Sequence, residues 1–288
     1  MDFLSRSLCL LSPLLLLFFS CEHKKEEIGM VYFEGGKATF GCVGNNCKIN
    51  EIPQHQVHVK SFYLQKSPVT VAEFRAFVKV TDYKTDAERF GNSGVFDLKS
   101  KDWIMVDGAN WEYPFGKNKD KSIDNHPVTQ VSWNDACAYC AWKKMRLPTE
   151  EEWEFAARFN ENEKYSWGVN ATTNGKWNAN AWQGVFPDTN TIEDGFLYTS
   201  PVGYFGENNS GLTDMGGNVW QWCSNTYTMY PNNPEPIEMV NTDKVIRGGS
   251  FLCDSNVCHG YQVFARNFCS SETSLIHLGF RCAKDEKP

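Results

Sequence analysis

The sequence lacks the features that mark nucleic-acid-binding, repeat and membrane-spanning proteins. Acidic residues outnumber basic ones, 35 against 28, the formal net charge is −7, and the basic residues are scattered. Because a clustered basic patch is the usual signature of nucleic-acid binding, we expect no nucleic-acid partner. There is also no internal repeat, no low-complexity tract and no convincing linker. Residues 29–288 are therefore expected to form a single domain.

The longest apolar run, Leu8–Phe19, is too short to span a membrane, and a proline interrupts it. A single arginine precedes this run and Ser20-Cys21 follows it, an arrangement typical of an export signal. We expect residues 1–20 to be a lipoprotein signal peptide, with lipid attached to Cys21 and residues 21–28 as a charged tether. A plainly cleaved signal is the alternative. Either way the chain is exported, and lipidation would anchor it to a membrane of the bacterial cell envelope.

Aromatic residues are abundant, with ten Trp, twenty Phe and eleven Tyr, whereas aliphatic residues are modest in number. This composition suits a compact, loop-rich α+β fold with an aromatic core and argues against a helical bundle. Alternating β-branched and aromatic residues predict strands at Gly29–Gly36 and Gln56–Tyr63. Capping motifs that begin at Thr70, Ser132 and Thr149 predict the first turns of three helices.

Residues 165–235 are dominated by Gly, Asn, Asp, Thr, Pro and Trp and show no sustained period. Long irregular segments in a compact domain are commonly functional or held in place by ions. Hard oxygen atoms that could bind Ca²⁺ are supplied by Asn180, Asp188, Asn190, Glu193, Asp194 and Asp214. Ordinary Asx turns are the alternative explanation for these residues.

The chain has eleven cysteines, and in an exported protein most of them are expected to form disulfides or bind metal. With Cys9 in the signal and Cys21 at the anchor set aside, nine remain, so at least one thiol should be free or metal-bound. Cys253 and Cys258 lie on one short loop, a spacing that suits either a disulfide or a thiophilic metal. A structural zinc site needs four ligands, and His259 is the one further candidate nearby. A site with two thiolates better suits Cu(I), although the spacing alone favours the disulfide.

Six strings carry a family resemblance. They are His126–Asp135, Arg146–Glu154, Phe186–Phe196, Gly217–Trp222, Arg247–Phe251 and Gly279–Ala283. In sequence, order and spacing they closely resemble the formylglycine-generating enzymes, from about residue 29 to 283. Several of these strings occur across a wider superfamily that includes members without this activity, whereas the cysteine pair after Gly-Gly-Ser is specific. The resemblance implies a mixed α/β fold with little regular structure, related to C-type lectin-like folds.

The resemblance also implies a reaction. It is the oxidation by O₂, with a thiol reductant, of a cysteine in the Cys-x-Pro-x-Arg motif of unfolded sulfatase polypeptides to Cα-formylglycine. The family's active-site cysteines, which hold Cu(I), map to Cys253 and Cys258. Its active-site serine maps to Ser250, which could alternatively form the turn after two glycines. An arginine retained after the pair, Arg266, is a candidate for substrate or active-site hydrogen bonding, with a structural salt bridge as the alternative.

Further positions transfer through the same resemblance. Trp220 and His277 are expected to line the substrate region, although a tryptophan is more often a core residue. The calcium ligands of the family map to a first set, formed by Asn180, Ala181, Asp194 and Phe196, and a second set, formed by Asp214, Gly217, Val219 and Gln221. In the second set the family commonly has Asn in place of Asp214 and Glu in place of Gln221.

One family disulfide maps to Cys140 and Cys282, and another maps to Ala157 and Val263, both apolar here. Cys42 and Cys47 can form a local bridge, and the partners of Cys137, Cys223 and Cys269 are unassigned.

Two other functions stay open at this point. One is a non-enzymatic structural or assembly lipoprotein of the same fold, which the anchor favours and the intact cysteine pair opposes. The other is a thiol-disulfide oxidoreductase that uses the same pair without copper.

Overall fold

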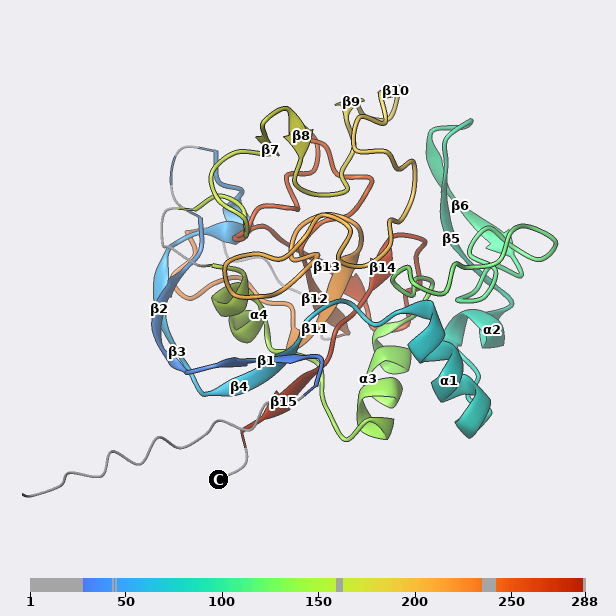
Figure 1. Ribbon diagram of the computed structural model, residues 1–288, viewed down its shortest axis with the longest axis horizontal. Helices are drawn as coiled ribbons and strands as arrows, with labels where there is room; N and C mark the ends of the chain where they lie inside the picture. Colours follow the sequence, from blue (N-terminus) through green and yellow to red (C-terminus); the bar gives the residue numbers. More distant parts are fainter. Residues whose placement is uncertain (1–27, 43, 45, 159–162, 235–241, 287–288) are drawn as a thin grey trace, which may run out of the picture.

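The computed structural model describes residues 28–42, 44, 46–158, 163–234 and 242–286 as one α+β domain (Figure 1). The expected signal peptide, the expected lipidation site Cys21 and most of the charged tether lie outside these residues. None of the helices described is long and apolar enough to cross a membrane.

The helices are short and begin where the capping residues predict. They are η1 (Ile49–Glu51, 3₁₀), α1 (Val71–Thr81), α2 (Asp86–Phe90), α3 (Trp133–Trp142) and α4 (Glu150–Ala157). At the start of α1 the Thr70 hydroxyl accepts a hydrogen bond from the N–H of Glu73, whose carboxylate accepts one from the N–H of Thr70. Such reciprocal bonds satisfy amides that a helix cannot pair internally. The three predicted helix starts are therefore confirmed.

Two larger sheets organise the strands. The first has the order β1 (Met30–Phe33), β4 (Phe62–Gln65) and β15 (Ala283–Asp285), and the second has the order β13 (Arg266–Ser270), β12 (Asp243–Arg247), β11 (Trp220–Thr226) and β14 (Leu278–Gly279). Four two-stranded hairpins complete the set: β2 (Gly36–Phe40) with β3 (His55–Val59), β5 (Asn92–Asp97) with β6 (Asp102–Asp107), β7 (Thr172–Thr173) with β8 (Lys176–Trp177), and β9 (Gly184–Val185) with β10 (Thr189–Asn190).

The continuous strand predicted over residues 56–63 is wrong. The chain forms β3 and β4 there, which belong to different sheets. The break falls at Lys60 and Ser61, where Gly35 approaches so closely that an added Cβ would lie 2.3 Å from the carbonyl oxygen of Val59. The Ser61 hydroxyl also accepts a hydrogen bond from the N–H of Gly35 at 3.2 Å. This crossing of two chain segments is a tertiary contact that a local pattern does not reveal.

The interior is aromatic, as the composition predicts. One cluster packs α1 and α3 against β11 and includes Phe74, Tyr139 and Trp222. Another, smaller cluster packs the β5–β6 hairpin against the segment that follows β12, and it includes Phe96 and Phe251. In Figure 1 the β5–β6 hairpin projects at the side of the molecule near the β9–β10 hairpin. The segment after β12 contains the Cys253–Cys258 pair, and it contributes to both of these clusters, because Cys253 belongs to the first and Phe251 to the other.

Candidate functional site

The cysteine pair lies on a loop that begins as β12 ends. Gly248 and Gly249 follow with φ of 93° and 66°, a left-handed conformation that glycine adopts without steric cost. A Cβ on Gly249 would lie 2.5 Å from the backbone nitrogen of Tyr261, so the start and end of the loop are in contact. The loop then brings Cys253 and Cys258 together as a disulfide, with their Cα atoms 4.8 Å apart.

Two carboxylates hold the far side of this loop. Asp254 accepts hydrogen bonds from the N–H groups of Val257, at 2.6 Å, and Cys258, at 3.4 Å, so an Asx-type turn sets the approach of the second cysteine. The fully buried Glu51 lies 2.6 Å from Nε2 of His259, the residue after Cys258. The loop is therefore fastened both to itself and to η1.

Ser250 and His277 meet beside the pair. The Ser250 hydroxyl lies 3.2 Å from His277 Nδ1 and accepts a hydrogen bond from the N–H of Leu252, while its carbonyl accepts one from the N–H of Cys253 at 2.9 Å. Burial lowers the pKa of His277 to about 3, so its imidazole is neutral at physiological pH. The structure supports the turn-forming role of Ser250, and its catalytic role stays a prediction.

The chemistry of the sulfur atoms fits a soft, low-coordinate metal once the disulfide is reduced. Cys253 is buried and Cys258 is partly exposed, so one side of the pair faces protein and the other can be reached by a further thiol. Within the described ranges, no three His, Cys, Asp or Glu side chains are grouped so as to hold a metal ion. Two thiolates without a third protein ligand match the preference of Cu(I).

Two of the predicted substrate residues make structural contacts. The Trp220 side chain is buried in the first core cluster against Gly260, where an added Cβ would lie 2.6 Å from the indole ring. Arg266 is buried in a two-point ion pair with Glu150, with nitrogen to oxygen distances of 2.8 and 2.6 Å, and its guanidinium stacks over Tyr230. These contacts support core packing for Trp220 and a structural salt bridge for Arg266, and a role of either residue in substrate binding stays a prediction. His277 adjoins Ser250 and retains part of its accessible surface, although protein atoms enclose most of its ring.

Arg266 belongs to a buried charge network that supports the start of the loop. Arg247 is fully buried and binds Glu150 at 2.8 Å, Glu154 through a very short contact, and the carbonyl of Val263 at 2.7 Å. Burial alone would raise the pKa of Glu154, but the charges of Arg247 and Arg158 outweigh it and hold that pKa below its ordinary value. Arg247, which directly precedes Gly248, is thus held in the protein interior by these contacts.

The first calcium set fits a cation. The Asn180 side-chain oxygen is buried and has no hydrogen-bond partner, and the N–H of the adjacent Ala181 binds Asp194 at 3.0 Å. Burial raises the pKa of Asp194, and no basic side chain forms an ion pair with it in the part of the chain that the structure describes. A buried carboxylate and an unpaired amide oxygen are ligands that Ca²⁺ prefers. The Ala181 carbonyl accepts a hydrogen bond from Gln183 Nε2, which would have to turn away for that carbonyl to bind the ion.

The second calcium set fits a cation less well, and calcium at this set stays a prediction. The Gln221 side-chain oxygen accepts hydrogen bonds from Trp153 Nε1 at 3.0 Å and Arg281 Nε at 2.7 Å. Two donors fix the orientation of the amide, so its NH₂ group points to the carbonyl of Asp214 at 2.6 Å. Where the family has Glu, a second carboxylate oxygen would occupy that position. A hydrogen-bond donor there opposes a cation.

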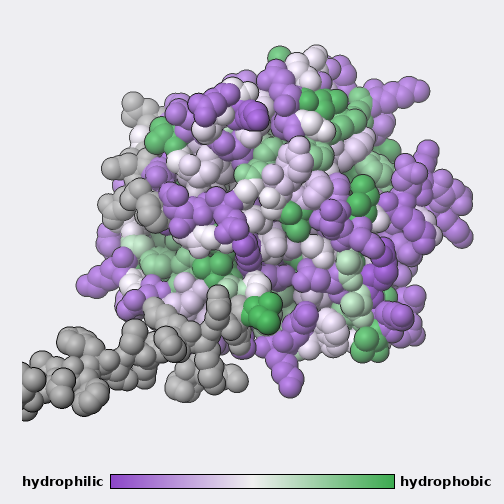
Figure 2. Space-filling model, in the orientation of Figure 1, coloured by the Kyte–Doolittle hydropathy of each residue, from purple (hydrophilic) through white to green (hydrophobic). Residues whose placement is uncertain are grey.

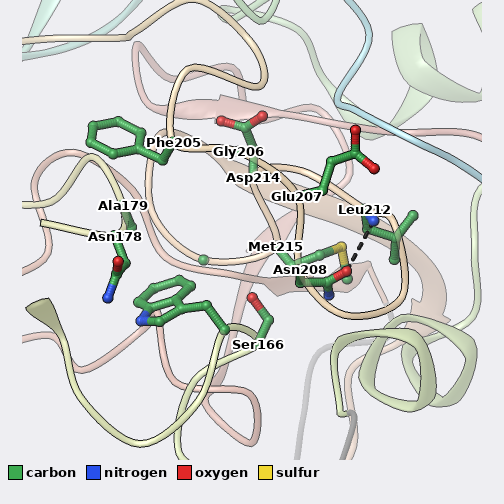
Figure 3. Close-up of a pocket in the computed structure, with 12 residues that line it drawn as sticks. Ser166, Asn178, Ala179, Phe205, Gly206, Glu207, Asn208, Leu212, Asp214 and Met215 are labelled. Carbon is green, nitrogen blue, oxygen red and sulfur yellow. Dashed lines mark hydrogen bonds between the residues drawn. The ribbon is translucent and has the colours of Figure 1, made fainter. Parts of the chain in front are cut away.

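Asp214 is also engaged. Its carboxylate accepts hydrogen bonds from the N–H of Gly203 at 2.7 Å and from Asn218 Nδ2 at 3.0 Å. It lines a cavity of about 130 Å³ with Glu207 and Asn208, shown in Figure 3, which contains neither cysteine of the pair. The buried Arg281 donates to the carbonyl of Asp214, so a fixed positive charge lies next to the proposed cage.

We expect the protein to retain one calcium ion per chain, at the first set, after exhaustive dialysis. Asp194→Asn should remove it, and Gln221→Glu, which replaces the opposing NH₂ by an oxygen, should add a second. Elemental analysis of dialysed protein gives the count. Thermal unfolding with and without chelator gives the stabilisation, about 2.7 kcal/mol when free calcium is 100 times its Kd.

Asp194→Asn is the matched control, because its unfolding temperature should no longer respond to chelator. Two calcium ions on the wild-type protein would show that the second set binds calcium as well. Full retention of calcium by the Asp194→Asn protein would contradict the first set.

The other described cysteines form one disulfide and five free thiols. Cys42 and Cys47 form the local bridge, while Cys140 and Cys282, expected as a disulfide, are both free thiols with sulfur atoms 3.1 Å apart. That separation is too long for a covalent bond, so the contact is present but the predicted disulfide is not. Three further cysteines without a predicted partner are also free: Cys137, Cys223 and Cys269. The apolar replacements Ala157 and Val263 are both buried in one core cluster, as their hydrophobicity predicts.

Several residues near the cysteine pair were not predicted from the sequence. Trp103, on β6, packs edge-on against His277 with ring centroids 4.8 Å apart. Nothing in its local pattern points to this contact, because Trp103 and His277 are far apart in the chain. The carboxylate of Asp254 had a local signal, since Asp-Ser-Asn is typical of an Asx turn. Glu51 had none, because the loop that it holds is remote in sequence.

Known proteins resemble this chain over most of its length. Residues 19–286 match the family described as "Sulfatase-modifying factor enzyme 1-like domain". A formylglycine-generating enzyme of Streptomyces coelicolor is 43% identical over 280 residues, which cover 89% of each protein. A Mus musculus protein named inactive C-alpha-formylglycine-generating enzyme 2 is 38% identical in a gapped alignment of 298 positions, which covers 95% of this chain and 93% of that one.

A solved structure, PvdO from Pseudomonas aeruginosa, has a TM-score of 0.66 and 24% identity, and the match covers 89% of this chain and 94% of that one. At this identity the likeness shows the fold alone. Together the comparisons confirm the family resemblance and the α+β fold.

Proposed function

The chain belongs to the sulfatase-modifying factor enzyme 1-like family, and from this premise we propose that it is a copper-dependent formylglycine-generating oxidase. Its substrate would be a cysteine in a Cys-x-Pro-x-Arg segment of an unfolded sulfatase. Cys253 and Cys258 carry the proposal, because they lie within bonding distance on a fixed loop, one buried and one accessible.

The proposed reaction balances when a thiol reductant takes part. Each substrate CH₂–SH reacts with one O₂ and two reductant thiols to give the aldehyde CHO, H₂S, water and one disulfide. The substrate carbon is oxidised, O₂ is reduced, and the reductant supplies the remaining two electrons and two protons. A thiol is also what opens the Cys253–Cys258 disulfide and prepares the pair.

The side chains of the site have separable tasks in this proposal. Cys253 and Cys258 would hold Cu(I), which supplies the thiophilic centre for the substrate sulfur and the electron for O₂. Asp254 and Glu51 keep the loop in a conformation that presents both sulfurs. Neutral His277 orients the Ser250 hydroxyl without adding a positive charge. The partly exposed side of Cys258 is where a third thiol can approach.

Mass spectrometry of a Cys-x-Pro-x-Arg peptide tests this proposal. The reduced protein, loaded with Cu(I) and supplied with dithiothreitol in air, is expected to convert the peptide CH₂SH to CHO. Omission of copper or of oxygen should each stop conversion. Folded, copper-bound protein that leaves the peptide unchanged in air would overturn the proposal.

One observation favours a second candidate, a non-enzymatic structural lipoprotein of this fold. A relative named as inactive matches nearly the whole chain. The lipid anchor at Cys21 and the location in the cell envelope belong to either proposal, and both rest on the sequence. In the structural alternative the cysteine pair would be a permanent disulfide, and variants without it would keep the protein's cellular role.

A further inference from the structure

The outer edge of β6 is an open sheet edge with exposed apolar side chains. Among the described residues β6 pairs with no strand except β5, so its other side is open to a further strand. Two of its backbone groups have local partners, since the N–H of Trp103 binds the Asp102 side chain and the carbonyl of Val106 accepts from the N–H of Ala109. Trp103 and Met105 are 40% and 65% exposed. Proteins usually block such an edge with charge, proline or a covering element, because it readily pairs with another chain. An edge left open and apolar therefore indicates a binding surface.

A second hairpin extends this apolar surface. Phe96 pairs with Trp103 across the β5–β6 hairpin, and its ring lies 5.1 Å from that of Phe186 in the β9–β10 turn. Val185 and Ile192, on the β9–β10 side, are exposed as well. We call Trp103, Met105, Val185 and Ile192 the hairpin patch. In Figure 2 apolar atoms gather where these two hairpins approach each other.

The hairpin patch is continuous with the cysteine loop. Trp103 contacts His277, and His277 in turn contacts the Ser250 hydroxyl. The carbonyl of Ser250 accepts a hydrogen bond from the N–H of Cys253. Phe251 and Leu252, between this serine and the cysteine, share a core cluster with Phe96. Three successive contacts thus lead from the open edge to the backbone of Cys253.

We propose that the outer edge of β6 binds an extended segment of the unfolded substrate polypeptide, next to the cysteine that is oxidised, as an added β-strand. This proposal rests on the proposed function. Main-chain hydrogen bonds to an edge strand give affinity that tolerates many sequences, while side chains on alternate residues contact the surface beneath. Alternate apolar residues of the substrate would rest on Trp103 and Met105. The exposed Asp102 and Asp107 at the ends of β6 favour basic residues at the ends of that segment.

The chemistry of the occupant follows from the edge itself. An unfolded polypeptide offers free backbone N–H and C=O groups together with apolar side chains, whereas a folded protein has already paired and buried them. A six-residue strand such as β6 spans about 20 Å. The docked segment would therefore extend well beyond a short recognition motif, and a long unfolded substrate would be held more tightly than a short one.

Binding and turnover of two peptides on the full-length chain test the proposal. One peptide carries the Cys-x-Pro-x-Arg motif alone, and the other adds eight flanking residues with alternating apolar side chains. With Met105→Asp, the preference for the long peptide, expressed as the ratio of kcat/KM values, should fall about tenfold. N-methylation of alternate amides in the added segment should weaken binding by a similar factor, because it removes backbone donors without altering the protein.

Val80→Asp is the matched control, since Val80 is equally exposed but lies on α1, remote from the loop, and it should leave the preference unchanged. An equal loss in both variants, or no preference for the long peptide, would overturn the proposal. So would conversion of a dimer to a monomer by Met105→Asp with unchanged peptide binding, because the patch would then bind a second copy of the chain.

Failure of docking can be told apart from failure of the oxidase. Binding of a long peptide with serine in place of its cysteine, followed by fluorescence anisotropy, needs no chemistry. Length-dependent binding that Met105→Asp abolishes, without any aldehyde formed, would keep the docking surface and reject the oxidase. Aldehyde formation with length-independent binding would keep the oxidase and reject the docking surface.

Discussion

Cys253→Ser and Cys258→Ser are each expected to lower formylglycine formation by about 10³-fold or more, equivalent to about 4 kcal/mol of barrier. Both sulfurs lie on one fixed loop, and a serine hydroxyl at either position is a poor ligand for a soft metal. The remaining thiol could not hold copper in a two-thiolate arrangement. Aldehyde yield by mass spectrometry and bound copper by elemental analysis should fall together.

The chain provides a matched control in its other local disulfide. Cys42–Cys47 has the same sequence separation of 5 as Cys253–Cys258. Closing a loop of this size stabilises a protein by about 2 kcal/mol in the chain-entropy treatment. Removing Cys42 and Cys47 together should therefore cost similar stability but little activity.

Two outcomes would contradict this expectation. Undiminished aldehyde formation in either serine variant would exclude the pair as the centre of the reaction. Copper-independent exchange with a disulfide substrate, lost in both variants, would instead support a thiol-disulfide oxidoreductase.

Arg247→Met is expected to destabilise the fold by about 3 to 5 kcal/mol, the cost of leaving buried carboxylates without a charge partner. The guanidinium lies between Glu150 and Glu154 with no exposed surface. The replacement keeps much of the side-chain volume but none of the charge. Because Arg247 directly precedes the two glycines of the cysteine loop, access of a thiol-specific reagent to reduced Cys253 should rise as well. Urea unfolding and labelling rates measure the two effects.

An exposed ion pair supplies the comparison. Arg75 contacts Asp124 at the surface, so Arg75→Met should change stability by less than about 1 kcal/mol. The double variant Arg247→Met, Glu154→Gln should recover part of the loss, because it also removes one uncompensated carboxylate. Equal effects of the Arg75 and Arg247 substitutions would show that the buried network contributes no special stability.

Local signals predict the fold best where a local interaction decides the structure. The start of α1 depends on a hydrogen-bond exchange within four residues, so the Thr70 to Glu73 pattern is sufficient. The segment 56–63 reads as one strand, yet it divides because Gly35, remote along the chain, crosses it. Propensity describes what a segment can form, and the partner decides where it ends.

The candidate site shows the same limit. Family resemblance draws attention to the cysteine loop, which directly follows the string Arg247–Phe251, and the structure brings its two cysteines together. It leaves two roles open for Arg266, and the ion pair with Glu150, on a different element, supports the structural one. It also assigns calcium to Gln221, although the amide orientation depends on Trp153 and Arg281 together. The role of such a residue depends on which groups it contacts in the folded protein, and the identity of one residue in the sequence does not reveal those contacts.

The three-stranded sheet has a consequence for when this protein can fold during its synthesis. Its middle strand, β4, pairs on one side with β1, near the start of the domain, and on the other with β15, whose last residue is Asp285. The ribosome must therefore complete nearly the whole chain before this sheet closes, which slows folding because distant segments must meet. The cysteine loop follows β12 in the four-stranded sheet, whose strand β14 (Leu278–Gly279) is also synthesised late, so the loop too acquires its geometry late. An enzyme proposed to act on nascent-like, extended chains is itself such a chain for most of its own biogenesis.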